Sequence, residues 1–372
     1  MFSHATKTLT AVLALHAGLV LSTRESALES RGLPEYNVLP ASEPHEIARV
    51  PLATDLVVLT RPSSSELIKA QIDPNTARPV AYRSFTMGRS SRSGLSGVNP
   101  SRAYPGRMWM SLKSENKLIL VNPGAAADLS AAPTIEMTID VPAPGNGPHY
   151  VYESDDGRVW AGLREPSEQT GKYYVFSADV ANPADYRLYE CLDSPAFIQQ
   201  HPATGLVYVT QDRASSIMSI DGGSGATSQL WIPSRLGNTP VGMTALPQGS
   251  PLAGVWFGLA GNATGGTGWF GRINDYGEMN LFQVRHPNLG NHPGFVHVAD
   301  ATEQTDDGDA ALWLLSTTQF SGKSADALVR VKFNEDASDA EFVEVISLAA
   351  QGAKMHRVLP VGKSVLVSEI KA

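Results

Sequence analysis

The sequence predicts an all-β fold, a single β-propeller of seven four-stranded antiparallel blades, with six blades as the alternative count. Two observations predict it. A unit of two short strands around a polar turn recurs roughly every 45 to 60 residues. Most copies are followed by a third and a fourth run with alternating apolar residues, which completes a four-stranded blade. The stretch after residue 22 shows no convincing helical periodicity.

The repeated unit is clearest as GPHYVYESDDGRVWAGL at residues 147–163 and SPAFIQQHPATGLVYVT from Ser194. Aromatic and β-branched residues dominate its runs, and Gly, Pro, Asn and Asp separate them, which favours strands over helices. The last unit, from Ala353, lacks its outer strands. We expect a strand around Tyr36 to Leu39 to pair with it, because an open sheet edge is otherwise left exposed. The units begin near Glu46, Ser101, Gly147, Ser194, Pro240, His292 and Ala353.

One position of the second strand is aromatic in five of these units. Packing between neighbouring blades explains such a recurrence better than ligand stacking, because large aromatic side chains contribute most of the buried apolar area of a core. We therefore expect burial of Trp109, Trp160, Tyr208, Trp256 and Trp313.

The composition limits the partners of the protein. The chain has 372 residues, of which 42% are hydrophobic and 18% charged, and this is typical of a globular domain. Its net charge of -8, without a cluster of Lys and Arg, excludes nucleic acid as the expected partner. We therefore set nucleic acid aside as a partner.

The N-terminal segment has the pattern of a secretory signal peptide. Lys7 precedes an apolar run from Leu9 to Leu21, which is shorter than the ~20 residues that span a bilayer as a helix. We predict a signal peptide at residues 1–22, cleavage between Ser22 and Ala27, a secreted protein without stable membrane insertion, and one propeller domain over residues 30–372. A signal anchor is the alternative.

Two further features of the sequence, a single cysteine and a glycosylation motif, are relevant to the predicted secretion. Cys191 is the single cysteine, so no disulfide can form within one molecule, and we interpret it as a small buried apolar residue. Asn262-Ala263-Thr264 is an acceptor site for N-glycosylation. We predict a glycan on Asn262.

Candidate site residues follow from propeller geometry. The start of the first strand and the end of the second strand of each blade lie on one rim of the channel, so distant parts of the chain meet there. The predicted catalytic residues are His149, Arg164, Gln211, His292 and His356. The predicted substrate-binding residues are Tyr104, Lys113, Arg213 and Gln319.

The chemistry of these residues suits general acid–base catalysis and stabilisation of an oxyanion. Histidine titrates near neutrality, and arginine offers paired hydrogen-bond donors. Each also has a plain interpretation, because His149 can be a satisfied turn residue and Arg164 a solvated charge. We predict no cofactor and no metal: Glu43-Pro44-His45 and the acidic turn at residues 306–309 are interpreted as solvated loops, and familiar catalytic and nucleotide motifs are absent from the sequence.

The segments GPHYVYESDDGRVWAG and PVGMTALP through WFGRINDYGE resemble the repeats of streptogramin B lyase-type propellers. This resemblance covers most of the mature chain and implies the fold more than the activity. The sequence lacks the late Glu-x-His pair that would hold Mg²⁺ and supply a base in such a lyase. The absence of this pair argues against that elimination chemistry.

The layout of the chain is similar to that of a family of fungal secreted propellers. The shared features are a signal peptide, one glycosylation site in the Gly-rich segment GLAGNATGGTGWFGRI, a single domain and almost no cysteine. The family includes allergen-type propellers and hetero-Diels-Alderases of the eupenifeldin and xenovulene type, which join a tropolone quinone methide to a humulene-type sesquiterpene.

This resemblance implies a cofactor-free cycloaddition in secondary metabolism that gives a meroterpenoid. In it, His149 would assist loss of water as a general acid or base, and Arg164 or Gln211 would polarise a carbonyl group. Two alternatives stay open: a propeller that binds a lipid or small molecule without turnover, and a metal-dependent lyase or lactonase.

Overall fold

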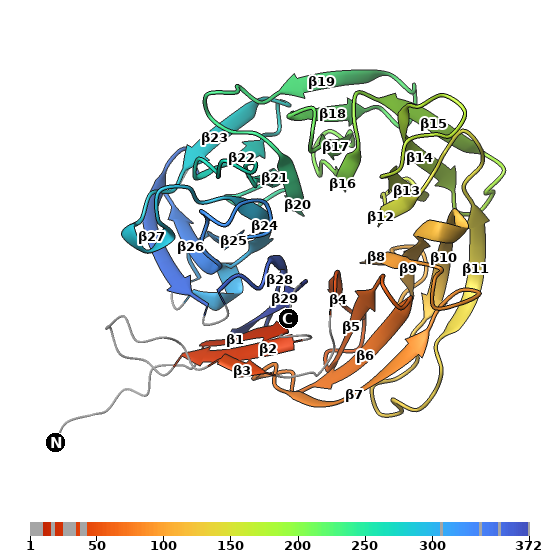
Figure 1. Ribbon diagram of the computed structural model, residues 1–372, viewed down its shortest axis with the longest axis horizontal. Coiled ribbons are helices and arrows are strands. Elements are labelled where there is room, and N and C mark those ends of the chain that lie inside the picture. The colour runs from red at the N-terminus through yellow and green to blue at the C-terminus, as the bar shows by residue number, and fades with distance from the viewer. Residues whose placement is uncertain are drawn as a thin grey trace.

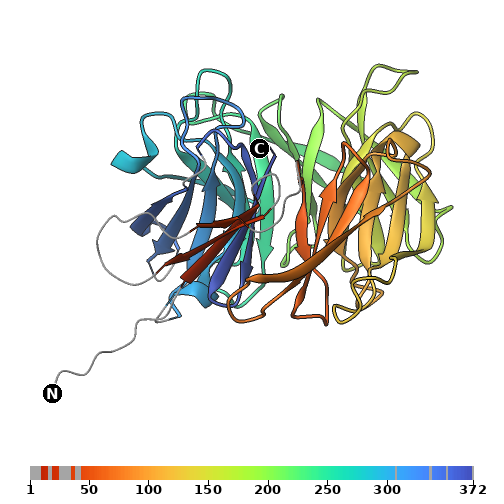
Figure 2. The same ribbon diagram turned by 60° about the horizontal axis from the view of Figure 1, so that its bottom comes forward.

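Six four-stranded antiparallel blades stand in a ring around a central axis (Figure 1). This arrangement comes from a computed structural model, which describes residues 10–15, 19–24, 35–37, 43–305, 308–334, 337–348 and 351–370. The strands of each blade run between the two faces of the ring (Figure 2). The prediction of an all-β propeller with four-stranded antiparallel blades is confirmed, and the described residues show six such blades, the lower of the two predicted counts.

Each blade uses four consecutive strands, and its first strand lies next to the channel. The short 3-10 helices η1 (Lys113–Glu115), η2 (Pro287–Leu289) and η3 (Thr302–Gln304) lie in connections. The strands of the six blades are β4 (Ile47–Arg49), β5 (Leu56–Arg61), β6 (Glu66–Ile72) and β7 (Pro79–Thr86); β8 (Leu95–Pro100), β9 (Met108–Leu112), β10 (Lys117–Asn122) and β11 (Thr134–Asp140); β12 (Pro148–Glu153), β13 (Arg158–Leu163), β14 (Tyr173–Asp179) and β15 (Tyr186–Cys191); β16 (Pro195–Gln200), β17 (Val207–Gln211), β18 (Ser216–Ile220) and β19 (Thr227–Trp231); β20 (Pro240–Leu246), β21 (Gly254–Leu259), β22 (Trp269–Ile273) and β23 (Met279–Gln283); and β24 (Phe295–Asp300), β25 (Ala311–Ser316), β26 (Ala327–Phe333) and β27 (Ala340–Ser347).

A mixed sheet occupies the remaining place in the ring, between the last blade and the first. It contains the antiparallel hairpin of β28 (Met355–Val361) and β29 (Ser364–Glu369). Strand β1 (Thr10–Leu15) pairs with β29 in parallel, and β2 (Leu19–Arg24) and β3 (Glu35–Asn37) follow outward. Backbone contacts between β28 and both β24 and β4 close the ring.

The N-terminal predictions have mixed outcomes. The expected strand near Tyr36 belongs to the sheet of the last hairpin, as β3, but it pairs with β2 rather than with β28 or β29. The segment predicted to be a signal peptide contributes β1 and most of β2 to this sheet, and its cleavage stays a prediction. Residues 1–9 and 38–42 lie outside the described residues. Among the described residues, no helix is both long and apolar enough to cross a membrane.

The recurring aromatic residues are buried, as predicted. Each lies on the second strand of its blade and is at most 2% exposed. The pairing register places each opposite a residue of the innermost strand, as Trp109 opposite Asn99 and Trp256 opposite Thr244. The aromatic layer therefore lies directly behind the wall of the channel and fixes the inner strands. Its members are Trp109, Trp160, Tyr208, Trp256 and Trp313.

Candidate functional site

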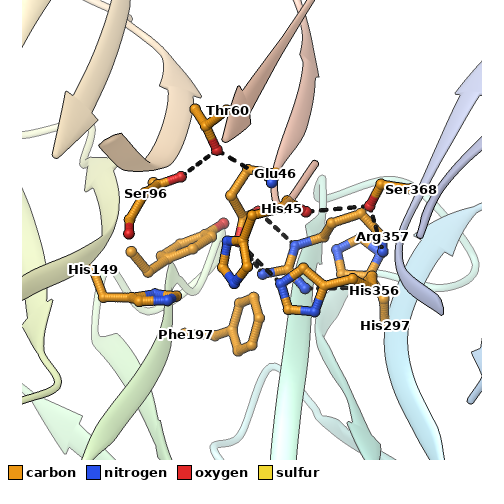
Figure 3. Close-up of polar contacts among 12 residues, drawn as sticks. His45, Glu46, Thr60, Ser96, His149, Phe197, His297, His356, Arg357 and Ser368 are labelled. Atoms are coloured by element: carbon orange, nitrogen blue, oxygen red, sulfur yellow. Dashed lines mark hydrogen bonds and ion pairs between the residues drawn. The ribbon is translucent and has the colours of Figure 1, made fainter. Parts of the chain in front are cut away.

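The innermost strands share an irregularity near their starts. A β-bulge places two residues of one strand opposite one residue of its partner and turns a side chain in a new direction. His149, Phe197 and His356 lie at such bulges, and Figure 3 shows their side chains gathered in the channel. The register shifts fall between Leu95 and Val98, Pro148 and Val151, Pro195 and Ile198, Val241 and Met243, Phe295 and His297, and Met355 and Arg357.

Close packing between inner strands fixes the backbone at His149. A Cβ atom on Gly97 of β8 would lie 2.2 Å from the carbonyl oxygen of His149, so only glycine fits there. The Ser111 hydroxyl donates to the same oxygen at 2.5 Å and accepts from the Gly97 N–H at 2.8 Å. The neighbouring blade thus holds His149 in place through its main chain.

A buried ion pair joins the first blade to the last hairpin. Glu46 and Arg357 are 2% and 3% exposed. Arg357 Nε donates to Glu46 Oε2 at 2.6 Å, and Nη2 donates to Oε1. The guanidinium also lies over the Phe197 ring, 4.2 Å from its centroid. Both charges are desolvated, so removing either one would leave the other buried without a partner and would destabilise the fold.

Backbone and hydroxyl groups hold this pair from both sides. The Glu46 N–H donates to Thr60 Oγ1 at 3.2 Å, and Thr60 Oγ1 donates to the Ser96 carbonyl at 2.5 Å. On the other side, the Arg357 N–H donates to Ser368 Oγ at 3.1 Å (Figure 3). The carboxylate and the guanidinium are therefore positioned before any ligand binds.

Three histidines form a layer above this ion pair, on the rim that carries the starts of the inner strands. We call His45, His149 and His356 the histidine layer. The ring centroid of His45 lies 4.8 Å from that of His149 and 4.1 Å from that of His356. His45 Nδ1 lies 3.3 Å and His356 Nε2 3.5 Å from Glu46 Oε1. The carboxylate is the common neighbour of two of the three rings.

The surroundings shift the pKa values of these groups strongly. Burial alone raises the pKa of Glu46, but the charge of Arg357 and the contacts from His356 and His45 outweigh it and hold this pKa well below its usual range. Burial, together with neighbouring positive charge, lowers the pKa of His149 and of His356 well below the usual value. At neutral pH, His149 and His356 are therefore uncharged beside an ionised carboxylate.

A cavity of about 450 Å³ lies on the side of Glu46 and Arg357 that faces away from the histidine layer. It follows the inner strands to Glu303 and Gln304, which lie at the face of the ring opposite the histidine layer. Most of its wall is apolar, including Val98, Met243 and Leu359. Its polar side chains include Asn99, Tyr150, Gln199 and His297. The charged residues Arg49, Asp300 and Glu303 also line it. A cavity of this size is typical of a site for a small molecule.

Two polar residues of the cavity wall are uncharged at neutral pH. Burial raises the pKa of Tyr150 to about 12. Burial, and next the charge of Arg357, lower the pKa of His297 to about 3. His297 Nδ1 accepts from the Val358 N–H at 3.4 Å, which leaves the proton of the neutral ring on Nε2. Both side chains can donate a hydrogen bond without carrying charge.

Acid is expected to destabilise the fold through His297. The folded-state pKa of His297 lies below the unfolded value of ~6.5, so its stabilising contribution is present above pH ~6.5 and is lost as the pH falls toward 3. Between pH ~6 and ~4.5 the free energy of unfolding should therefore fall more steeply in the wild type than in His297→Gln, by about 1.4 kcal/mol per pH unit. Urea unfolding at each pH measures both slopes, and equal slopes would contradict the prediction.

The structure brings together three of the residues predicted from the sequence. His149 and His356 belong to the histidine layer, and Gln319 Oε1 lies 3.4 Å from His356 Nδ1. Arg164 lies on the same rim, where its charge contributes to lowering the pKa of His149, and it donates to Asp212 Oδ2 at 2.8 Å.

Three further predicted residues lie on this rim, and of these Lys113 acts on the histidine layer through its charge, which contributes to lowering the pKa of His149. Lys113 forms an ion pair with Glu165. Arg213 is exposed, and its Nη1 lies 3.4 Å from the Tyr173 hydroxyl oxygen. Asn262 follows β21 in an exposed turn, so the glycan acceptor is accessible, and the glycan itself stays a prediction.

Three predicted positions are corrected by the structure. Tyr104 lies in the turn between β8 and β9, at the opposite face, because the first strand of that blade ends at Pro100 instead of beginning at Ser101. Gln211 is fully buried within its blade, where it accepts from the Leu192 N–H at 2.7 Å. It cannot reach a ligand in the channel.

His292 is the third correction. It is exposed and lines a separate cavity of about 720 Å³ over the outer strands β22 and β23, together with Trp269 and Gln283. The inner strand of this blade begins only at Phe295, so the loop that carries His292 passes outside the channel. His297, inside β24, is the histidine of this blade that lines the central cavity.

The sequence interpretation missed Glu46, Arg357, His297 and Tyr150, and it set His45 aside as part of a solvated loop. One pattern was available to find them, since a histidine stands within or next to the first strand in HEIAR, PHYVY, GFVHVAD and KMHRV. That pattern does not show which rim or which depth each side chain occupies, because the bulges change the alternation of the strand.

Comparisons with known proteins support the fold. No protein-family model matches the chain, and no curated protein sequence matches it. Among solved structures, virginiamycin B lyase from Staphylococcus aureus is similar with a TM-score of 0.63 and 16% identity, covering 88% of this chain and 92% of that chain. A streptogramin B lyase structure gives 0.61 and 16%, covering 88% and 94%.

A protein from Lactobacillus plantarum is also similar, with a TM-score of 0.59 and 15% identity, covering 97% of this chain and 99% of that chain. At these identities the likeness is one of fold. The comparisons give no support to the resemblance to the fungal hetero-Diels-Alderases. The chain is thus a propeller whose structural neighbours include streptogramin B lyase-like propellers.

Proposed function

We propose that the protein is an enzyme of secondary metabolism that binds two small, largely apolar molecules in its central cavity and joins them by a hetero-Diels-Alder cycloaddition. The substrates would be a tropolone-derived o-quinone methide and a humulene-type sesquiterpene. The observation that carries the proposal is the cavity of about 450 Å³, in whose wall apolar side chains lie beside the uncharged hydrogen-bond donors Tyr150 and His297. The layout shared with fungal secreted propellers supplies the reaction class.

The cavity suits a reaction that depends on orientation. A cycloaddition forms its bonds between two molecules without an enzyme nucleophile, so holding both partners in contact supplies most of the acceleration. Such positioning can contribute ~7 to 11 kcal/mol to lowering the barrier. The side chains of Val98, Met243 and Leu359 would hold the alkene by apolar contact.

Uncharged donors suit the polar partner of this reaction. A hydrogen bond to the carbonyl oxygen of the quinone methide makes the heterodiene more electrophilic, and it acts most strongly in a desolvated site. Tyr150 and His297 can supply it, because their shifted pKa values keep both neutral. They replace Arg164 and Gln211 in this role, since Arg164 is paired with Asp212 and Gln211 is buried in its blade.

Filling the cavity is expected to abolish turnover. Leu359 lines the cavity and is only partly buried, and it also packs against the apolar cluster that includes Ile47 and Leu366. We expect the larger ring of Leu359→Trp to extend from there into the channel. The purified protein is incubated with a quinone methide precursor and humulenol, and adduct formation is followed by chromatography. We expect the enzymatic rate to fall at least ~100-fold, because lost positioning removes several kcal/mol of barrier lowering.

Leu192→Trp is the matched control. Leu192 is 56% exposed in the connection between β15 and β16, outside the cavity, so the same substitution there should leave the rate unchanged. Adduct formation by the wild type at the uncatalysed rate would overturn the proposed reaction. An unchanged rate in Leu359→Trp would overturn the assignment of the reaction to this cavity.

A further inference from the structure

Three side chains with metal-binding atoms meet where the two ends of the ring join. His45 Nδ1, His356 Nε2 and a Glu46 carboxylate oxygen can each supply one ligand, and these atoms lie within 4.8 Å of one another. We propose that they bind one divalent transition-metal ion, with Zn²⁺ as the preferred ion, in a three-ligand site that leaves a coordination position open. This inference goes beyond the proposed cycloaddition and does not depend on it.

The distances are close to those of a zinc tetrahedron. Zinc bonds to imidazole nitrogen and carboxylate oxygen are ~2.0 to 2.2 Å long, so neighbouring ligand atoms stand about 3.4 Å apart. Glu46 Oε1 lies 3.3 Å from His45 Nδ1 and 3.5 Å from His356 Nε2. Two of the three ligand separations therefore fit already, and the third, between His45 Nδ1 and His356 Nε2, is at most 4.8 Å.

The hydrogen bonding of His356 directs an unshared electron pair toward this position. Gln319 Oε1 lies 3.4 Å from His356 Nδ1 and can accept a proton held there, and this is the tautomer that leaves Nε2 unprotonated for a metal ion. His356 Nε2 lies 3.5 Å from Glu46 Oε1, and in this tautomer no proton stands between the two atoms. His356 is 6% exposed, and its Nε2 has no hydrogen-bond partner. A cation between the two atoms satisfies both, and a second group that orients a metal-binding histidine in this way is common.

Arg357 determines which metal the site prefers. Its Nε donates to Glu46 Oε2 at 2.6 Å and its Nη2 donates to Oε1, so both carboxylate oxygens are fixed while Oε1 also faces the imidazoles. Its positive charge also opposes a cation held mainly by electrostatic attraction. Mg²⁺ and Ca²⁺ prefer several oxygen ligands and would find one carboxylate, whereas Zn²⁺ bonds well to imidazole nitrogen. We therefore expect Zn²⁺ to bind and Mg²⁺ not to bind.

Titration calorimetry of the chelator-treated full-length protein tests the site. We expect one equivalent of Zn²⁺ to bind and MgCl₂ to give no binding heat. His45→Gln and His356→Gln, which keep most of the side-chain volume, should each weaken Zn²⁺ binding at least ~10-fold, because a three-ligand site loses one ligand. Replacement by Co²⁺ gives a second readout, since its visible absorption reports coordination by nitrogen ligands.

His292→Ala is the matched control, because His292 is exposed and lies outside the histidine layer. It should bind Zn²⁺ like the wild type. Circular dichroism establishes that each variant is folded, and His45→Gln decides the result if His356→Gln fails to fold. Absence of Zn²⁺ binding to the wild type overturns the proposal, as does binding that is unchanged in both variants.

Discussion

Arg357→Met is expected to lower the free energy of unfolding by about 3–5 kcal/mol, because it leaves the buried carboxylate of Glu46 without its charged partner. Glu46 is 2% exposed and Arg357 3%, so bulk water solvates the unpaired carboxylate poorly. Methionine can keep much of the apolar contact with Phe197, over which the guanidinium now lies. The loss therefore reports mainly the uncompensated charge. Urea unfolding at neutral pH measures it.

The double variant Glu46→Leu with Arg357→Met is the informative comparison. Replacing both members of a buried ion pair by apolar residues is often neutral, so we expect the double variant to recover most of the lost stability. Its recovery would separate the cost of an unpaired charge from the cost of altered packing. A double variant as unstable as Arg357→Met alone would contradict this explanation.

Glu153→Ala is expected to be comparably damaging, with a loss of about 3–4 kcal/mol, since one substitution leaves four donors without an acceptor. Glu153 is the last residue of β12. Its carboxylate accepts from Ser101 Oγ at 2.6 Å and from Trp109 Nε1 at 2.8 Å. It also accepts from the N–H groups of Arg102 and Ala103 at 2.9 and 3.0 Å. Glu153 is 2% exposed. These hydrogen bonds hold the turn between β8 and β9 of the neighbouring blade against the end of β12.

Two further variants make the test of Glu153 specific. Glu153→Gln retains one acceptor oxygen and should lose less stability than Glu153→Ala. Asp155→Ala removes a carboxylate two residues away whose ion pair with Arg102 is largely exposed, and its effect should stay within about 1 kcal/mol. Thermal or urea unfolding of the three variants ranks them. Equal losses in Asp155→Ala and Glu153→Ala would contradict the role assigned to the buried acceptor.

Much of the fold could be predicted from the sequence because each blade repeats the same local chemistry. Alternating runs, polar turns and an aromatic residue on the second strand recur, and burial of the five aromatic side chains follows from that recurrence. The boundaries of individual strands were harder to predict than the repeat itself. Tyr104 was placed at the wrong face because Leu95–Pro100 has little apolar alternation, so the start of the inner strand was assigned too late.

The candidate site could be predicted only in part. His149, His356 and Gln319 were found because they lie on the rim where first strands begin. Glu46 and Arg357 were not, because their pairing depends on which strand of the last hairpin stands beside β4. The bulges also escaped prediction, since a shift of register within a strand leaves no periodic pattern in the residues.

The contact between Glu46 and Arg357 joins positions 311 residues apart. Such a contact forms late in folding, because the chain between must first be ordered and the entropy of closing so long a loop must be offset. A partly synthesised chain with only its early blades has the Glu46 carboxylate but neither its guanidinium nor the imidazole of His356. The ion pair and the histidine layer are therefore complete only once the last hairpin has joined the first blade.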